Sequence, residues 1–386
     1  MNPPPTAVIV RDGMPGTAYF FGAADSTLVG GPGDHGLLAE GLARRRASCP
    51  PADTVHPPGA WVGAFRYDGS FVFHDCPHVR VGTCDELWPE QMTAAADQSG
   101  LVHPWMETLD RHGYRAVVNA AKEHIRAGDI YQVNLTRRFW QPSAGDNAYE
   151  LFRHLWSVTE APLSAFLSLP GGALCSASPE LFLSIQGRQA TTRPIKGTRP
   201  RERDPMRDAQ NAYELVSSPK EQAELVMITD LERNDLGRIC EYGSVEVAEL
   251  VKREAFSHVF HLVSTVTGRL RSGIGPVEAV AACFPGGSIT GAPKKRAMEI
   301  ISALETEPRG WYTGAMGYFG YDGSAQFNIA IRTLVLEEGV LHFHTGSGIT
   351  ADSDPGQEFD ETRHKASALL QAVAQYRSSH MAGVTT

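Results

Sequence analysis

Two segments of the sequence place glutamates at the start of a predicted helix. Ser218-Pro219 and Asp354-Pro355 each set a capping side chain before a proline, which is typical of a helix N-terminus. Two pairs of glutamates follow, three residues apart on one helix face: Glu221 with Glu224, and Glu358 with Glu361. Four carboxylates on two such faces offer the hard oxygen ligands that Mg²⁺ prefers. The alternative is that they only cap the helices and complement their dipoles.

A lysine between two arginines is a candidate nucleophile. It lies in the run Arg193-Pro194-Ile195-Lys196-Gly197-Thr198-Arg199. Neighbouring cations and partial burial lower the pKa of a lysine and free its amine for attack. The same pattern is also typical of a solvated basic loop or an anion clamp, so the residue types alone leave these alternatives open.

A glycine-rich segment at residues 285–294 has the glycine spacing of a phosphate-binding loop. Ala292-Pro293 stands where that loop needs a lysine and a hydroxyl residue, so nucleotide binding is disfavoured. We expect instead a tight turn into a helix, where the hydroxyls of Ser288 and Thr290 could hold an anion.

Isolated polar residues also interrupt apolar segments. His261 lies in a strand-like run, where a histidine is more often structural than catalytic. Arg332 follows another such run and needs a carboxylate partner from the protein or from a ligand. Gly346 and Gly348 permit a close approach of the backbone, although this spacing alone is a weak indication of a site.

The composition indicates an ordinary globular chain. It has 386 residues, 42% of them hydrophobic, and a net charge of −9, which argues against nucleic-acid binding. No apolar stretch approaches the roughly 20 residues that a membrane-spanning helix needs. The N-terminus shows no secretory signal pattern, and the six cysteines form no CxxC pair. We therefore expect a cytoplasmic enzyme.

Strand-like segments outnumber helical ones, and many follow one another through tight turns. We expect strands at residues 6–10, 60–67, 70–74, 130–139, 164–169, 181–186, 259–267, 315–321, 325–335 and 341–344. We expect helices at residues 114–125, from Pro219, and at 293–304 and 357–375. The pattern favours an α+β fold with largely antiparallel sheets. A β-rich part at 1–108 and a catalytic part at 109–386 would form one intertwined fold.

Together these segments resemble the chorismate-utilising enzymes, which include anthranilate, aminodeoxychorismate, isochorismate and salicylate synthases. The matching motifs include GDIYQVNLT (128–136), SASPELF (176–182), RPIKGTRPR (193–201), KEQAELVMITDLERNDLGR (220–238), PGGSITGAPK (285–294) and GSGITADSDPGQEFDETRHKA (346–366). The resemblance implies two large, mainly antiparallel sheets that pack together and are flanked by helices, as in anthranilate synthase component I.

The resemblance also implies roles for individual residues. Glu224 and Glu361 match direct Mg²⁺ ligands, and Glu221 and Glu358 match glutamates that hold metal-bound waters. The residues that match the chorismate-binding pocket are Ser288, Tyr312, Arg332, Gly346, Gly348 and Lys365. Glu180 matches the general acid that protonates the departing C4 hydroxyl, and His261 matches the histidine beside it.

Two positions distinguish the branches of this family. Gln132 stands where isochorismate and salicylate synthases carry a lysine base, which disfavours attack by water. Lys196 stands where anthranilate synthases have alanine, and a lysine there is the signature of aminodeoxychorismate synthase component I. In that branch the lysine attacks chorismate covalently and ammonia then displaces it, giving 4-amino-4-deoxychorismate for p-aminobenzoate and folate synthesis.

The resemblance implies that a separate glutamine amidotransferase subunit supplies the ammonia. The nearest alternative function is that of anthranilate synthase component I, which differs at residue 196. A non-catalytic scaffold for an amidotransferase is a third possibility. Retention of all the catalytic and ligand positions, from Glu180 to Glu361, argues against it.

Overall fold

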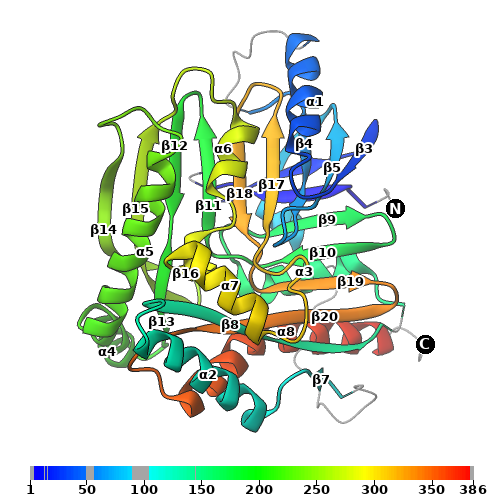
Figure 1. The fold of residues 1–386 in the computed structure, drawn as a ribbon. Helices are drawn as coiled ribbons and strands as arrows, with labels where there is room; N and C mark the ends of the chain where they lie inside the picture. Colours follow the sequence, from blue (N-terminus) through cyan, green and yellow to red (C-terminus); the bar gives the residue numbers. More distant parts are fainter. Residues whose placement is uncertain are drawn as a thin grey trace.

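The computed structural model describes residues 4–12, 14, 16–48, 56–88, 104–143 and 145–382, the side chains of 380–382 excepted. Within these residues the chain forms two 10-stranded sheets, called sheet A and sheet B here. All the pairings between neighbouring strands are antiparallel, for example β8 with β20 and β13 with β15. The two sheets pack together and helices flank them (Figure 1), which confirms the predicted fold class.

Sheet A has the strand order β16-β8-β20-β19-β10-β9-β1-β2-β6, and β7 also pairs with β8. Its strands are β1 (Ala7–Val10), β2 (Thr17–Phe21), β6 (Val79–Thr83), β7 (Met106–Glu107), β8 (Gln132–Pro142), β9 (Ala165–Leu169), β10 (Gly172–Ser176), β16 (Gly291–Ala292), β19 (Thr333–Glu337) and β20 (Val340–Ile349).

Sheet B has the order β13-β15-β12-β11-β18-β17-β4-β5-β3, and β14 also pairs with β15. Its strands are β3 (Ser26–Gly30), β4 (Ala60–Phe65), β5 (Phe71–Cys76), β11 (Leu181–Gln186), β12 (Gln189–Arg193), β13 (Ile195–Pro200), β14 (Glu246–Ala255), β15 (Val259–Arg269), β17 (Ala315–Gly320) and β18 (Ala325–Ile329). Strands from the first hundred residues therefore extend both sheets.

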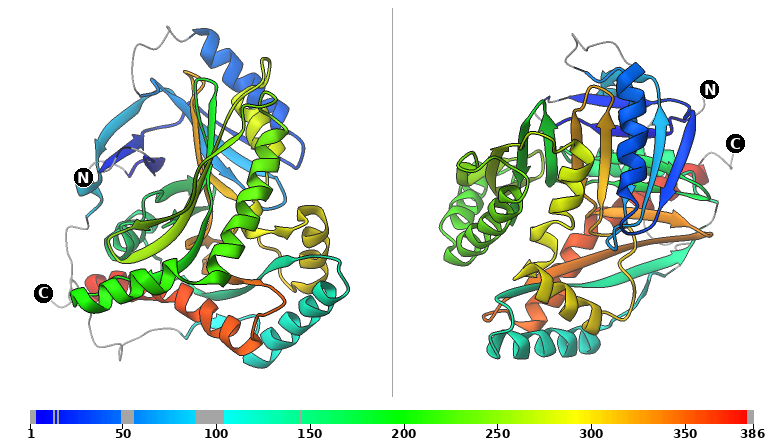
Figure 2. Two further views of the ribbon diagram at one scale, coloured as in Figure 1. Left: turned by 90° about the vertical axis from the view of Figure 1, so that its left-hand side faces the viewer. Right: turned by 45° about the horizontal axis from the view of Figure 1, so that its top comes forward.

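Helices cover the outer faces of the sheets. They are α1 (His35–Ser48), α2 (Arg111–Arg126), α3 (Ala148–Thr159), α4 (Pro205–Val216), α5 (Pro219–Gly237), α6 (Pro276–Cys283), α7 (Lys294–Leu304) and α8 (Pro355–Ala382), with 3₁₀ turns at Cys84–Leu87 and Gly287–Ile289. Helices α2 and α8 lie against β8 and β20, and α5 packs along β15 (Figures 1 and 2). In the part of the chain described, no helix is long and apolar enough to cross a membrane.

Three apolar clusters hold these layers together. Residues such as Ile9, Val62 and Met316 fill the space between the sheets. A second cluster packs α1 and α6 on sheet B, and a third packs α3 and α8 on sheet A. Each cluster is composed of side chains that alternate along the strands, so burial of one face of each strand stabilises the sandwich.

One predicted element is wrong in an informative way. The apolar run at residues 325–335 was expected as a single strand, but it forms β18 in sheet B and β19 in sheet A. The chain crosses between the sheets at Ala330–Arg332, and Arg332 has φ +49, a left-handed conformation that is rare for a residue with a side chain. The crossing places Arg332 where the two sheets meet.

Candidate functional site

Lys196 lies on a β-bulge. It is opposite Leu262 of β15, and the register of β13 shifts between Lys196 and Thr198. Gly197 at the bulge has φ +67, and a Cβ there would lie 2.7 Å from Cδ1 of Leu215. Only glycine fits such a position without strain, and a bulge changes the direction in which neighbouring side chains point. Gly197 therefore permits the bulge in the pairing of β13 with β15 on which Lys196 lies.

Glu180 precedes β11 and is only 4% exposed. Its carboxylate lies 3.5 Å from the backbone N–H of Ile195, next to Lys196. Burial raises the pKa of Glu180, and the Ser288 hydroxyl and the charge of Lys196 oppose that rise only in part. A raised pKa favours the protonated form of the carboxyl group, which is the form that a general acid needs.

His261 points one ring nitrogen at the bulge. Nδ1 lies 2.9 Å from the Gly197 carbonyl oxygen, so Nδ1 must be the protonated nitrogen that donates to it. Nε2 is buried and has no partner among the described residues. Burial, helped by the charge of Arg332, lowers the pKa of His261 to about 4. The imidazole is therefore neutral near pH 7 and presents an unprotonated Nε2 as a hydrogen-bond acceptor.

Arg332 forms no ion pair within 4.0 Å among the residues that the structure describes. Burial lowers the pKa of Arg332, although the negative charge of Glu180 opposes that fall. The charges of Glu180 and Arg332 also act on Tyr312. The Tyr312 ring stacks on the ring of His344, with the two centroids 5.4 Å apart and an angle of 19° between the ring planes. An unpaired arginine beside a buried tyrosine suits a ligand carboxylate.

The loop at residues 285–293 forms the predicted turn into a helix. Its two hydroxyls differ in their partners. The Thr290 hydroxyl donates to the carbonyl of Gly286 at 3.0 Å, so it is used within the loop. The Ser288 hydroxyl lies near Glu180, is buried, and makes no hydrogen bond of normal geometry in the described part of the chain. Of the two hydroxyls, that of Ser288 is therefore the one that is not used within the loop and that faces Glu180.

Gly346 and Gly348 lie on β20, paired with Thr136 and Asn134 of β8. A Cβ at Gly348 would lie 2.4 Å from Nε2 of Gln132. Gln132 is fully buried, and neither its amide nitrogen nor its amide oxygen has a partner among the described residues. A buried amide without partners costs free energy unless a ligand or water binds it. In the sequence, Gln132 stands out only because it occupies the position where related synthases carry a lysine base, and no binding role was predicted for this residue.

The two pairs of glutamates lie at the first turns of α5 and α8, as predicted. Ser218 and Asp354 cap these helices, the former by accepting from the Glu221 N–H at 3.4 Å. Lys220 lies 3.9 Å from the carboxylate of Glu224 and 3.8 Å from that of Glu358, so it spans the two helices. The tertiary fold thus brings together residues that are more than 130 positions apart in sequence.

The two proposed direct ligands have different electrostatic surroundings. Burial raises the pKa of Glu224, and the charges of Glu221 and Glu361 add to the rise. Burial would also raise the pKa of Glu361, but Lys365, at 2.6 Å, brings it below the usual value. Lys365 also donates to the carbonyl of Gly346 at 3.0 Å, which joins α8 to β20.

The carboxylates fit Mg²⁺ in their chemistry. In the described part of the chain, no three His, Cys, Asp or Glu side chains approach closely enough to hold a metal ion together. Lys220 instead supplies a positive charge between the two helices, at 3.8–3.9 Å from one carboxylate on each. A divalent cation that took the place of the Lys220 ammonium group would be surrounded by carboxylate oxygens from both helices.

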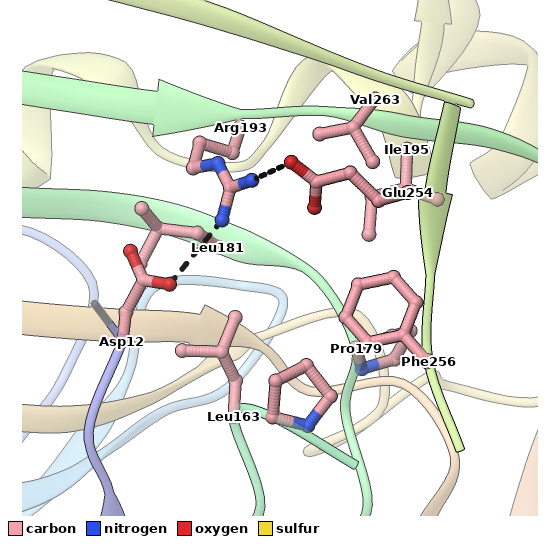
Figure 3. Close-up of a pocket in the computed structure, with 10 residues that line it drawn as sticks. Asp12, Leu163, Pro179, Leu181, Arg193, Ile195, Glu254, Phe256 and Val263 are labelled. Atoms are coloured by element: carbon pink, nitrogen blue, oxygen red, sulfur yellow. Dashed lines mark hydrogen bonds and ion pairs between the residues drawn. The ribbon is translucent and has the colours of Figure 1, made fainter. Parts of the chain in front are cut away.

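A small pocket near Glu180 and Lys196 is lined in part by Arg193. Its guanidinium bridges Asp12, at 3.3 Å, and Glu254, at 2.5 Å (Figure 3). Pro179 and Ile195, which line the pocket, are next to Glu180 and Lys196 in sequence. Arg199 in turn lies 4.0 Å from Glu221. Both arginines that flank the lysine therefore face carboxylates.

The comparison with protein families decides the family. Residues 42–371 match the family described as "chorismate binding enzyme". The chain belongs to the chorismate-binding enzyme family. Its structure resembles that of anthranilate synthase component I from Streptococcus pneumoniae TIGR4, with a TM-score of 0.75 and 26% identity over 93% of this chain and 94% of that one.

Curated members of the chorismate-binding family carry two different names. Anthranilate synthase component 1 of Streptomyces coelicolor is 48% identical over 270 residues, 70% of this chain and 53% of that protein. Aminodeoxychorismate synthase component 1 of Klebsiella aerogenes is 43% identical over 306 residues, 79% of this chain and 66% of that protein. The chain thus spans about half to two thirds of the length of these relatives.

Proposed function

We propose that the protein is the chorismate-binding component of an aminodeoxychorismate synthase. The observation that carries the proposal is Lys196, on the bulge beside Glu180, at the position where the resemblance puts alanine in anthranilate synthases. The charge of Lys196 acts on Glu180, Glu224 and Glu361, which supports a place for the amine near both the proposed acid and the proposed metal ligands.

The first step of the proposed reaction forms a bond to the protein. The neutral amine of Lys196 attacks C2 of chorismate, the ring double bonds shift, and the C4–O bond breaks. Glu180 gives its proton to the departing hydroxyl, which leaves as water. The unprotonated Nε2 of His261 accepts a hydrogen bond beside the leaving group.

The second step reverses the shift of the double bonds. Ammonia attacks C4, and the bond between C2 and Lys196 breaks, which restores the free amine. The new ammonium group returns one proton to the Glu180 carboxylate. In the net reaction, chorismate and ammonia form 4-amino-4-deoxychorismate and water, and the enzyme is regenerated.

The remaining residues bind and orient the substrate. Arg332, Tyr312 and the backbone N–H of Gly348 would bind the enolpyruvyl carboxylate, while Ser288, Gly346 and Lys365 line the pocket. Mg²⁺ would be held directly by Glu224 and Glu361 and through water by Glu221 and Glu358. When bound it would neutralise the ring carboxylate of chorismate.

Ammonia would come from a separate glutamine amidotransferase subunit, because curated relatives of this chain are named as component 1. We further propose that the product serves p-aminobenzoate and folate synthesis in the cytoplasm. The second candidate function is that of anthranilate synthase component I. It is favoured by the 48% identity to the Streptomyces coelicolor protein, against 43% for the Klebsiella aerogenes protein.

Product analysis tests the proposal. Purified protein with chorismate, Mg²⁺ and ammonium should form 4-amino-4-deoxychorismate, detected by chromatography after conversion to p-aminobenzoate by an added lyase. Glutamine should replace ammonium only after an amidotransferase subunit is added. Anthranilate as the main product would reject the proposal in favour of the second candidate.

The Lys196→Ala variant tests the covalent step. We expect it to lose most of the ammonium-dependent activity. Mass spectrometry of the wild-type protein with chorismate, but without ammonia, should show an adduct at Lys196. Lys252→Ala, which alters an exposed lysine on β14, is the control and should keep both the activity and the adduct. Full activity of Lys196→Ala would remove the covalent mechanism but not the product assignment.

A further inference from the structure

Behind the candidate site lies a buried ion pair that the proposed reaction does not use. Nε and one terminal nitrogen of Arg309 each donate to the Glu305 carboxylate at 2.8 Å, a bidentate contact. The side chains are 1% and 6% exposed. Glu305 follows α7, and Arg309 lies in the connection from α7 to Tyr312. Transfer of two such charges from water into the protein is costly, so their net contribution to stability is small.

Besides a 3.3 Å contact with the Thr313 hydroxyl, the guanidinium donates to main-chain carbonyls from two separate elements. It donates to Ile289, in the loop that carries Ser288, at 2.9 Å and to Asn134, on β8, at 2.8 Å. The Glu305 carboxylate accepts from the backbone N–H of Thr136 at 3.0 Å. A planar guanidinium fixes the angle between such partners, which a lysine cannot do.

Each of these contacts is next to a proposed substrate-binding group. Ile289 directly follows Ser288, and the Asn134 amide holds the Ser288 carbonyl at 2.9 Å. Asn134 and Thr136 are the β8 partners of the two glycines of β20. The carbonyl of Arg309 itself accepts from the Tyr312 N–H at 3.0 Å. One ion pair therefore connects the serine loop, the glycine strands and the tyrosine.

We propose that the Arg309–Glu305 pair is a positioning device for chorismate binding. It holds Ser288, Tyr312 and the backbone at Gly346 and Gly348 in one fixed arrangement without touching the substrate. The proposal rests on the proposed assignment of these groups to chorismate. Displacements of the order of 1 Å in positioned groups can reduce a rate by about 100-fold, which is the size of effect such a device would prevent.

A second ion pair, of which one member also contacts β8, gives a control. Arg377 of α8 lies 3.3 Å from Asp146 and 3.1 Å from the amide oxygen of Gln141 on β8. Gln141 is five residues along β8 from Thr136, or about 17 Å in an extended strand. Loss of this pair should affect stability without reaching the site.

The test compares Arg309→Lys and Glu305→Gln with Arg377→Lys, all in the full chain with Mg²⁺. Chorismate affinity is measured by calorimetry, and KM and kcat are measured by chorismate consumption with ammonium. We expect Arg309→Lys to weaken binding and raise KM by about tenfold to 100-fold, with a smaller fall in kcat. Glu305→Gln keeps one acceptor oxygen and should show a smaller increase in KM. Arg377→Lys should keep KM within twofold, even if its melting temperature falls equally.

Two results would overturn the positioning role. One is an affinity within twofold of wild type in both Arg309→Lys and Glu305→Gln. The other is an equal loss of affinity in Arg377→Lys at equal melting temperature. If Arg309→Lys does not fold, Glu305→Gln decides the matter by the same criteria. Calorimetry measures chorismate binding whatever the product is, so a wild-type product other than 4-amino-4-deoxychorismate would refute the proposed function and leave this test intact.

Discussion

The two sheets contribute different kinds of groups to the candidate site. Sheet B and the turn that precedes β11 contribute residues that hold or accept protons: Glu180, Lys196 and His261. Two of them have pKa values shifted mainly by burial, upward for Glu180 and downward for His261. Main-chain contacts at Ile195 and Gly197 position these two side chains.

Sheet A and α8 contribute space and unpaired polar groups. On β20 the site residues are glycines, and on β8 the amide of Gln132 lacks partners among the described residues. Lys365 of α8 donates to the backbone of the same strand.

This difference follows from what each side has to do. A group that transfers a proton needs a shifted pKa, which requires a dry, crowded environment. A surface that binds a polar ligand needs donors and acceptors that the protein leaves free. Substitutions on the sheet B side should therefore lower kcat, whereas those on the binding side should weaken affinity.

Glu180→Gln should show the largest effect of this comparison. Loss of the proton donor should lower kcat by about 10²- to 10⁴-fold while chorismate affinity changes little. Steady-state kinetics with ammonium and calorimetry with chorismate measure the two quantities. Glu254→Gln, in the neighbouring pocket, is the control and should retain kcat. A parallel loss of affinity and rate in Glu180→Gln would place the carboxyl on the binding side instead.

Arg332→Ala should weaken chorismate binding with a smaller effect on kcat. Loss of a charge-assisted contact costs roughly 1.5–3 kcal/mol, or about ten- to 150-fold in Kd. Alanine is strained at φ +49, so Arg332→Asn, which tolerates that conformation better, separates loss of charge from backbone strain. Unchanged affinity in both variants would show that Arg332 does not bind the substrate.

Glu224→Gln and Glu361→Gln test whether both helices serve one metal ion. Each variant should need about tenfold more Mg²⁺ for half-maximal activity, because each would lose one charged ligand. Glu246→Gln, on the exposed part of β14, should not change the requirement. Mg²⁺ titrations that coincide with wild type in both variants would remove the metal assignment, whereas a change in one alone would limit the site to one helix.

The smallest expected effect concerns pH and stability. The pKa of His261 is about 4 in the folded protein, against about 6.5 for an unperturbed histidine. The folded state therefore binds fewer protons in this interval, and the free energy of unfolding falls as pH decreases from 6.5 toward 4. Urea unfolding should show a smaller decrease between pH 7 and 4.5 in His261→Gln than in wild type. Equal decreases would show that the His261 imidazole gains no protons on unfolding.

Local signals predicted the helices of the site well. The cap-and-proline starts at Ser218 and Asp354 begin α5 and α8 where expected, because capping depends on a few neighbouring residues. The α2 and α7 predictions also agree with the structure. Helices α1, α3, α4 and α6 were not predicted. The α1 sequence shows no clear apolar face, whereas α4 begins after a recognisable capping residue, Asp204.

Residue types and short-range spacing thus determined the capped helix starts and, through a family resemblance, the composition of the site. Only the tertiary structure decided that the run at 325–335 divides between two sheets, that Lys220 spans two glutamate-bearing helices, and that Arg309 reaches both the serine loop and β8. The physical reason is range. Capping involves neighbours along the chain, whereas strand pairing, the bulge beside Lys196 and buried ion pairs depend on contacts between residues far apart in sequence.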